Sequence, residues 1–437
     1  MLKHLLTFCF LGLLAGHQVL GQQTKQRVFT SDIDRFWVAY DSMRTTTDSL
    51  RQLSYLNRIY IEPGTPGLRA LMEAKDYTPG EWVSAVRRYP RFWNSIRPRT
   101  LLAKSGVEGL EDYLLKFKAL YPALRPATIY FTIGALRSGG TTQDSLVLIG
   151  AEVSTGTPAV DISEFSKATQ IFLANNYRTD PIKHIIPLNV HEYVHTQIRH
   201  YGQNVLGQAI YEGICDLITQ LVTGKTMPYA YTSYGPQHEA ALKERFKTEM
   251  FVPSFRNWFY NNSSEDPNHI GDLGYYMGYA ICKAYYQRAT NKQQAIREMI
   301  ELDYTSNLAV EAFLTKSRYF SGSSVAALRV AYERKRPYVT QIRPLVSSQA
   351  VDASLKELII EFSQPMSPYT SIDYGAGGKT TWPNLKKVGF ATDKRSITFK
   401  VDLLPEHDYE FVVTDGGFQS EDGYPLKPYS VRFRTGK

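Results

Sequence analysis

The chain has 437 residues, 43% of them hydrophobic and 21% charged, with a formal net charge of +8. Its lysines and arginines are scattered in short groups such as Arg87-Arg88 and form no basic helix or stripe, which argues against a nucleic-acid-binding protein. The length predicts two or three domains.

Residues 1–21 have the pattern of a secretory signal peptide. Lys3 precedes the apolar run Leu5–Ala15, and Gly21 lies at the expected cleavage edge. The alternative is a membrane anchor, but the run is shorter than the roughly 20 residues of a membrane span. Cys9 has no small residue before it, which argues against lipid attachment. We therefore expect an exported mature chain, periplasmic or extracellular, without a membrane span.

The sequence pattern of residues 22–127 predicts a mainly helical N-terminal part. We recognise no catalytic or binding motif in it. Asp32 or Asp34 can cap a first helix, residues 63–67 (Pro-Gly-Thr-Pro-Gly) break the chain, and a further helix begins at Leu68. More helices are expected over about residues 79–89 and 107–119.

Two apolar segments, residues 128–136 and 145–153, have the composition of β-strands and flank a loop that contains Gly139-Gly140. We expect them to pair as a hairpin. An edge strand of this kind can bind an extended peptide by β-augmentation, or the hairpin can simply be part of the core. The sequence leaves both alternatives open.

The segment 187–200 contains an HExxH motif formed by His191, Glu192 and His195. On an α-helix the two histidines lie one turn apart on the same face, so both imidazoles can reach one ion while Glu192 faces its open position. The helix is expected to begin near Pro187, or to be kinked there. The alternative is an amphipathic helix with two histidines in a polar pocket.

A second helix, over about residues 204–222, supplies a candidate third ligand. Its apolar surface carries two acids, Glu212 and Asp216, again four residues apart. Buried carboxylates need a metal or a hydrogen-bond partner. We expect Glu212 to bind the ion, Asp216 to accept a hydrogen bond from the other ring nitrogen of one histidine, and Gly213 to allow close approach of the two helices.

The following segments are expected to be a tyrosine-rich loop at 226–236, a polar helix at 238–250, a loop at 261–272 and a tyrosine-rich helix at 273–288. We assign structural roles to His200 and His238. An exported chain permits a disulfide between Cys215 and Cys282, but both lie in apolar helices, where free cysteines are commonly buried. Both possibilities stay open.

Residues 341–437 consist of short alternating segments divided by Pro, Gly and Asp turns, which predict a β-sandwich. The sequences FSQPM at 362–366 and RFRTG near the end resemble those of bacterial Ig-like modules. A sequence at 375–380 looks like a phosphate-binding loop, but Asp373 occupies the place of its first glycine, so we reject that reading.

The combination HEYVHTQ, YEGICD, IGALRSGGTT, LIGAEV and GYYMGYAICKAYY resembles a family of predicted zinc-dependent proteases, over about residues 30–330. HExxH followed by Glu and Asp is similar to the gluzincin arrangement of metallopeptidases. A relative among gliding-motility lipoproteins lacks the zinc motif. The resemblance implies a Tyr or His that stabilises the oxyanion, in a window with His269, Tyr275 and Tyr276; Tyr275 is our choice.

We therefore predict an α+β zincin-like metallopeptidase, largely helical with a small β-sheet, followed by an all-β Ig-like sandwich. The predicted domains are a signal peptide at 1–21, a helical part at 22–127, a catalytic domain at 128–338 and an Ig-like domain at 341–437. Zn²⁺ bound by His191, His195 and Glu212 would activate a water, with Glu192 as general base, to hydrolyse a peptide or protein substrate.

Two alternatives belong to other classes. One is a non-enzymatic cell-envelope protein on a metal-binding zincin scaffold, with a surface partner bound through the Ig-like domain. The other is a zinc hydrolase whose substrate is not a peptide.

Overall fold

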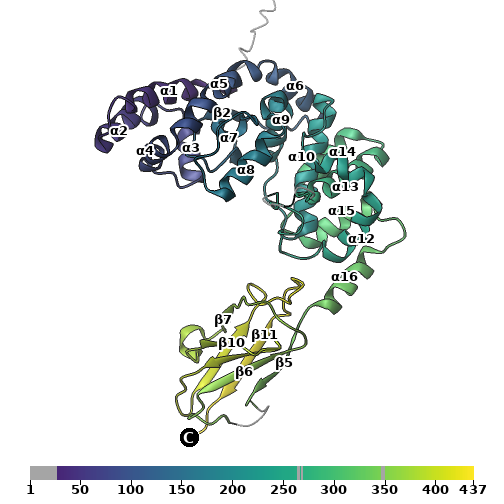
Figure 1. Ribbon diagram of the computed structural model, residues 1–437. Helices are drawn as coiled ribbons and strands as arrows, with labels where there is room; N and C mark the ends of the chain where they lie inside the picture. Colours follow the sequence, from purple (N-terminus) through teal and green to yellow (C-terminus); the bar gives the residue numbers. More distant parts are fainter. Residues whose placement is uncertain (1–26, 263–265, 267–268, 346–349) are drawn as a thin grey trace, which may run out of the picture.

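The computed structural model describes residues 27–437 except 263–265, 267–268 and 346–349. A large, mainly helical part holds a small sheet and is followed by a β-rich region at the C-terminal end (Figure 1). The expected signal peptide lies outside the described residues. Among the residues described, no helix combines the length and the apolar character that crossing a membrane requires.

Helices form the N-terminal part, as the sequence predicts. Three of them begin with a proline, Pro66, Pro79 or Pro90, at a position where the missing N–H is not needed. Asp48 caps α2 by accepting hydrogen bonds from the two backbone N–H groups of Leu50 and Arg51. The helices are α1 (Ser31–Met43), α2 (Ser49–Leu56), α3 (Pro66–Ala74), α4 (Pro79–Arg88), α5 (Pro90–Gly106) and α6 (Leu110–Leu120), with a π-helical turn at Asn57–Ile61.

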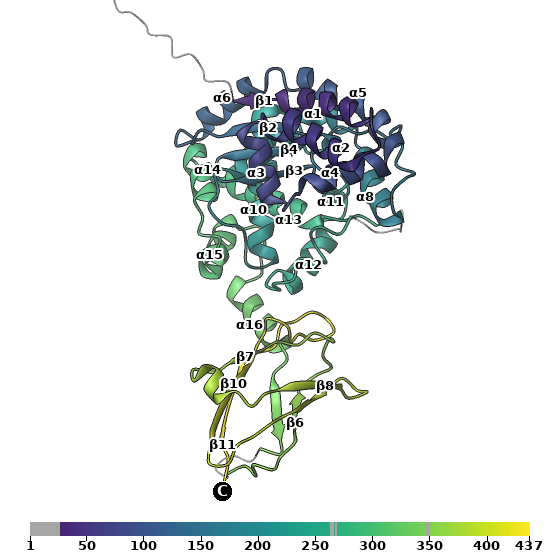
Figure 2. The same ribbon diagram turned by 90° about the vertical axis from the view of Figure 1, so that its left-hand side faces the viewer.

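The small sheet has the strand order β1-β2-β4-β3. Its strands are β1 (Val28–Phe29), β2 (Thr128–Thr132), β3 (Gly140–Gln143) and β4 (Leu146–Gly150). β2 runs parallel to both β1 and β4, while β3 is antiparallel to β4 and forms the edge. The helices α1 and α3 contact β2, and Figure 2 shows them lying across the sheet.

The predicted pairing of 128–136 with 145–153 as a hairpin is therefore wrong. The hairpin is formed by β3 and β4 around Asp144, which adopts φ 51°. The polar sequence of β3, Gly-Thr-Thr-Gln, concealed a strand inside the expected loop. The end of the second predicted strand is helical instead, because Ala151 begins the short helix α7 (Ala151–Ser154).

The second half of the helical part contains the HExxH helix, α9, and the helix that follows it, α10. The segment expected to be a tyrosine-rich loop instead contains α11, and α9 begins two residues before Pro187. The elements are α8 (Lys167–Tyr177), a 3₁₀ turn at Pro181–His184, α9 (Ile185–His195), α10 (Val205–Thr223), α11 (Tyr231–Gln237), α12 (Glu239–Glu249), α13 (Leu273–Arg288), α14 (Lys292–Ile300), α15 (Asn307–Ser317) and α16 (Val325–Lys335).

Helices α10 and α13 approach each other through two glycines. A Cβ on Gly213 would lie 2.0 Å from the carbonyl carbon of Gly278, and a Cβ on Gly278 would lie 1.5 Å from the carbonyl oxygen of Ala209. The expectation that Gly213 permits a close helix contact thus holds, but the helix it meets is α13 rather than α9. This contact packs α13 closely against α10, the helix that carries Glu212.

The C-terminal region forms two antiparallel sheets with a core of their own. One sheet has the order β5-β6-β9-β8 and the other β11-β10-β7. Buried and less buried residues alternate along β6 and β10, as expected for strands with one face in a core. The strands are β5 (Val339–Arg343), β6 (Glu357–Phe362), β7 (Ile372–Tyr374), β8 (Lys386–Phe390), β9 (Ser396–Lys400), β10 (Asp408–Val413) and β11 (Tyr429–Arg434).

Tyr424 joins the two parts of the molecule. Its ring packs against Tyr332 of α16 at a centroid distance of 5.7 Å, and its hydroxyl donates to the carbonyl oxygen of Thr248 at 3.2 Å. Arg336 donates to the carbonyl oxygens of Pro425 and Leu426. The β-rich region is therefore docked on the helical part by buried and polar contacts as well as by the chain connection.

Candidate metal centre

The predicted ligands come together where α9 passes α10. His191 and His195 lie one turn apart on α9, with ring centroids 4.8 Å apart. Glu212 and Asp216 lie one turn apart on the buried face of α10. The side chains of His191, His195 and Glu212 are each less than 10% exposed. The structure thus encloses four polar side chains between two apolar helices.

Three of these side chains direct one atom each at a common point. Nε2 of His191 and Nε2 of His195 are 3.1 Å apart, and Oε2 of Glu212 lies 3.4 Å and 3.2 Å from them, respectively. Zinc bonds of 2.0–2.1 Å in a tetrahedral site separate the ligand atoms by about 3.3–3.4 Å. Oε2 of Glu212 is buried without a hydrogen-bond partner. These residues fit a zinc ion.

The cluster favours positive charge. Burial opposes protonation of His191, but its contacts with the Asp216 and Glu212 carboxylates outweigh burial and raise its pKa to about 10. Burial also opposes the charge on Glu212, yet the two neighbouring histidines lower its pKa to about 2. The carboxylates therefore make this buried point a favourable place for a cation.

Asp216 fixes the orientation of one candidate ligand. Its Oδ1 lies 2.8 Å from Nδ1 of His191, and its Oδ2 accepts a hydrogen bond from the Tyr231 hydroxyl at 3.0 Å. A proton on Nδ1 leaves the lone pair on Nε2, the atom that faces the common point. This is the contact that the sequence predicts, and the structure identifies His191 as the histidine involved.

Gln208 is a residue that the sequence analysis missed. Its Nε2 donates to Oε1 of Glu212 at 2.9 Å and to the Tyr260 hydroxyl at 3.2 Å. The amide holds Glu212 by one oxygen and leaves the other directed at the histidines. The signal was present in the sequence, because Gln208, Glu212 and Asp216 follow each other at intervals of four along α10.

Cys215 offers a second possible grouping, since ligand atoms of Cys215, His191 and His195 lie within 4.8 Å of one another. Its Sγ lies 3.4 Å from Nδ1 of His195, the ring nitrogen opposite the one that faces Glu212. Burial raises the pKa of the thiol well above its usual value, and the thiol donates to the carbonyl oxygen of Tyr211. We favour Glu212, because its distances are shorter and it carries the charge. Cys215 and Cys282 are both free.

Glu192 lies between α9 and the edge strand of the sheet. A Cβ on Gly140, the first residue of β3, would be 3.5 Å from Oε1 of Glu192. That separation is an ordinary van der Waals contact, so the Glu192 carboxylate lies directly beside the backbone of β3. The predicted general base therefore faces the strand edge along which an extended chain can lie.

Of the three candidates for the oxyanion donor, Tyr275 lies close to the cluster. The other two, His269 and Tyr276, form hydrogen bonds with other groups. The Tyr275 ring is 6.3 Å from that of His191 and stacks on Tyr231 at 5.4 Å. Tyr276 donates its hydroxyl to Glu239, and His269 is exposed with Nε2 beside the carbonyl oxygen of Asn261. No hydrogen bond of the Tyr275 hydroxyl is found among the described residues.

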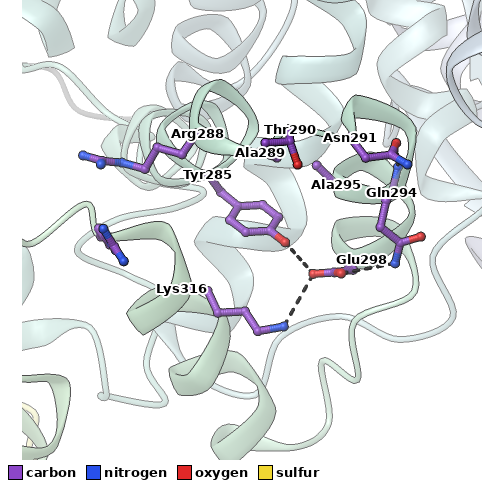
Figure 3. A pocket seen from close by; sticks show the side chains of 10 residues that line it. Tyr285, Arg288, Ala289, Thr290, Asn291, Gln294, Ala295, Glu298 and Lys316 are labelled. Atoms are coloured by element: carbon purple, nitrogen blue, oxygen red, sulfur yellow. Dashed lines mark hydrogen bonds and ion pairs between the residues drawn. The ribbon is translucent and has the colours of Figure 1, made fainter.

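A depression of about 610 Å³ lies away from this cluster, at the end of α13 and the start of α14 (Figure 3). There Glu298 accepts from Tyr285 and Gln294 and pairs with Lys316. None of the predicted site residues lines it. Its shape alone therefore does not make it the candidate site, which we place at the histidines.

No curated protein sequence matches the chain. Among solved structures, CopC from Methylosinus trichosporium OB3b is 24% identical over 23% of this chain and 94% of its own, with a TM-score of 0.19. The S-layer protein rSbsC(31-844) is 11% identical over 93% of this chain and 45% of its own, with a TM-score of 0.18. The N-terminal part of the S-layer protein SbsC is 13% identical over 62% and 67%, with a TM-score of 0.18. We infer neither fold nor function from these low TM-scores.

A family model matches a defined part of the chain. Residues 160–308 match the family described as "Predicted Zn-dependent protease (DUF2268)". The matched segment includes α9 and α10, which carry the cluster, and α13, which packs against α10. Over the segment that holds the candidate metal centre, the chain is therefore similar to a family of predicted zinc-dependent proteases.

Proposed function

We propose that the protein is an exported zinc metallopeptidase of the gluzincin-like type, with a zincin-like domain and a C-terminal Ig-like domain. The observation that carries the proposal is the triangle of His191 Nε2, His195 Nε2 and Glu212 Oε2, with sides of 3.1–3.4 Å. The family match over residues 160–308 supports the same activity.

His191, His195 and Glu212 would hold Zn²⁺, which as a Lewis acid lowers the pKa of a bound water from 15.7 to about 7. Glu192 follows the first ligand on α9 and projects toward β3. Its carboxylate would take a proton from the attacking water and deliver it to the leaving amine. Asp216 would keep the Nδ1 proton on His191, so that Nε2 stays available as a ligand.

The strand β3 would align the substrate. It is the last strand of the order β1-β2-β4-β3, so its outer edge pairs with no other strand of that sheet. An extended peptide can bind to that edge through backbone hydrogen bonds. Gly140 would then place a peptide bond beside Glu192. This proposal gives the β3–β4 hairpin, rather than the pairing first expected, the substrate-binding role.

The test separates metal binding from turnover. Glu192→Gln should keep zinc and lose peptide cleavage, because the amide cannot accept the proton, whereas His191→Ala should lose both. Cleavage is measured by mass spectrometry on a mixed peptide library and zinc by elemental mass spectrometry. Glu108→Gln, at an exposed glutamate of the first helical part, is the matched control. Undiminished cleavage by Glu192→Gln would contradict the general-base assignment.

A further inference from the structure

Tyr260 combines an exposed ring with an unusual backbone conformation. The residue is 66% exposed, although its neighbours Trp258 and Phe259 are buried. Its φ is +56°, in the left-handed region that a bulky residue other than glycine rarely adopts. Such conformations require support from the surrounding structure, and they are concentrated at functional sites. The position of Tyr260 therefore calls for an explanation.

The hydroxyl of Tyr260 is linked to the candidate metal centre through Gln208. It accepts a hydrogen bond from Nε2 of Gln208, a side chain only 2% exposed, and the same amide nitrogen donates to Oε1 of Glu212. Because the Glu212 carboxylate accepts and does not donate, the NH₂ group of Gln208 must face it. The side-chain amide of Gln208 thus links Glu212, a predicted metal ligand, to the hydroxyl of Tyr260.

In this arrangement the hydroxyl proton of Tyr260 has no hydrogen-bond acceptor among the described residues. An NH₂ group only donates, so the phenol oxygen is the acceptor in its bond with Gln208. Among the described residues, no group accepts a hydrogen bond from the Tyr260 hydroxyl. The O–H is consequently available to an acceptor that enters from the exposed side.

Burial and nearby negative charges keep the Tyr260 hydroxyl protonated. Burial of the hydroxyl end raises its pKa well above the usual value, and the negative charges of Glu212, Asp272 and Glu192 raise it further. The hydroxyl therefore remains a neutral donor across the physiological range.

Tyr275 is less suited to meet a substrate. Its ring stacks on Tyr231 at 5.4 Å and meets Phe259 edge to face at 5.5 Å. These two contacts hold it in aromatic packing with Tyr231 of α11 and Phe259, whereas Tyr260 has an exposed ring and a hydroxyl that contacts Gln208.

We propose, on the basis of the proposed function, that Tyr260 donates a hydrogen bond to the scissile carbonyl oxygen as negative charge develops there, and that Gln208 is the positioning residue that couples this donor to Glu212. The phenol O–H bond does not break. The transition state is stabilised more than the bound substrate, because a hydrogen bond to a charged oxygen is stronger than one to a neutral carbonyl. Tyr260 thus replaces Tyr275 as our assignment of the oxyanion donor.

The test uses the zinc-loaded protein and the dipeptide Leu-Trp with a phosphoryl group on its amino nitrogen, whose charged oxygens copy the oxyanion. Calorimetry should show that Tyr260→Phe weakens binding of this probe by about 10- to 100-fold, because a hydrogen bond to a charged group is lost. Zinc content and the binding of unmodified Leu-Trp should not change. Tyr286→Phe, at the far end of α13, is the matched control for loss of a tyrosine hydroxyl.

A double substitution tests the role of Gln208. If Gln208 acts by positioning Tyr260, Gln208→Met should weaken binding of the phosphoryl probe less in the Tyr260→Phe background than in the wild type. Equal effects in both backgrounds would show that Gln208 serves only Glu212 or the fold, and would overturn that half of the proposal.

The outcomes also separate this inference from the proposed function. Failure of the zinc-loaded wild type to bind the phosphoryl probe would overturn both. Tight binding by the wild type and equally tight binding by Tyr260→Phe would overturn the assignment of Tyr260 alone. The same conclusion would follow if Tyr275→Phe, and not Tyr260→Phe, lost affinity.

Discussion

Oδ1 of Asp216 lies 2.8 Å from Nδ1 of His191, inside the contact of α9 and α10. This carboxylate sets the tautomer of a predicted ligand and adds negative charge behind it. We expect Asp216→Asn to weaken zinc affinity by about 10- to 100-fold, as is typical for such supporting groups. Competition with a chromophoric chelator measures the change.

Tyr231→Phe is the control for this effect, since it removes the hydroxyl that donates to the other oxygen of Asp216 but keeps the carboxylate. Its effect on zinc affinity should be smaller. Unchanged affinity in Asp216→Asn would show that His191 does not depend on this contact.

Cys215 should not be a zinc ligand. Its thiol is buried, is held in the neutral form by a raised pKa and lies at the opposite ring nitrogen of His195. Cys215→Ala should therefore retain the zinc content of the wild type, as should Cys282→Ala. Loss of zinc in Cys215→Ala alone would favour a His-His-Cys site over the one with Glu212.

Glu152 predicts a pH dependence of stability. The residue is fully buried; burial raises its pKa to about 7, while the backbone N–H groups of Gly134 and Leu136 oppose that rise. Between the unfolded pKa of 4.5 and about 7, the folded state holds a proton that the unfolded state has released. Stability from this group is thus complete at acidic pH and falls as pH rises through 7, by about 3 kcal/mol in all.

Urea unfolding at about pH 5 and about pH 8 measures this fall. Glu152→Gln should reduce the difference between the two pH values, because the amide does not titrate, and should lower stability at the acidic value through loss of one acceptor. Glu108→Gln should keep the wild-type difference. An unchanged pH dependence in Glu152→Gln would show that another group causes it.

Helical periodicity made much of the candidate site predictable. His191 and His195 share a face of α9, and Glu212 and Asp216 share a face of α10, because a spacing of four residues corresponds to about one turn. The same spacing rule would also have placed Gln208 on the face of α10 that carries Glu212 and Asp216. As metal ligands these residues remain a prediction, which the distances between their atoms support.

Contacts between distant segments could not be predicted in this way. The periodicity of a strand gives its faces but not its partner or direction, so β2 and β4 were expected to form a hairpin although they are parallel. Gly213 indicated a close approach without identifying α13 as the partner. Tyr260 lies in an irregular segment, whose path depends on tertiary packing rather than on local pattern.

The central claim is that His191, His195 and Glu212 hold one zinc ion, and elemental mass spectrometry of the purified mature chain tests it most directly. We predict about one zinc per chain in the wild type and in Glu108→Ala, and loss of zinc in Glu212→Ala, which removes the charged oxygen of the triangle. A wild type that stays metal-free after zinc loading, or a Glu212→Ala variant that retains its zinc, would contradict the account.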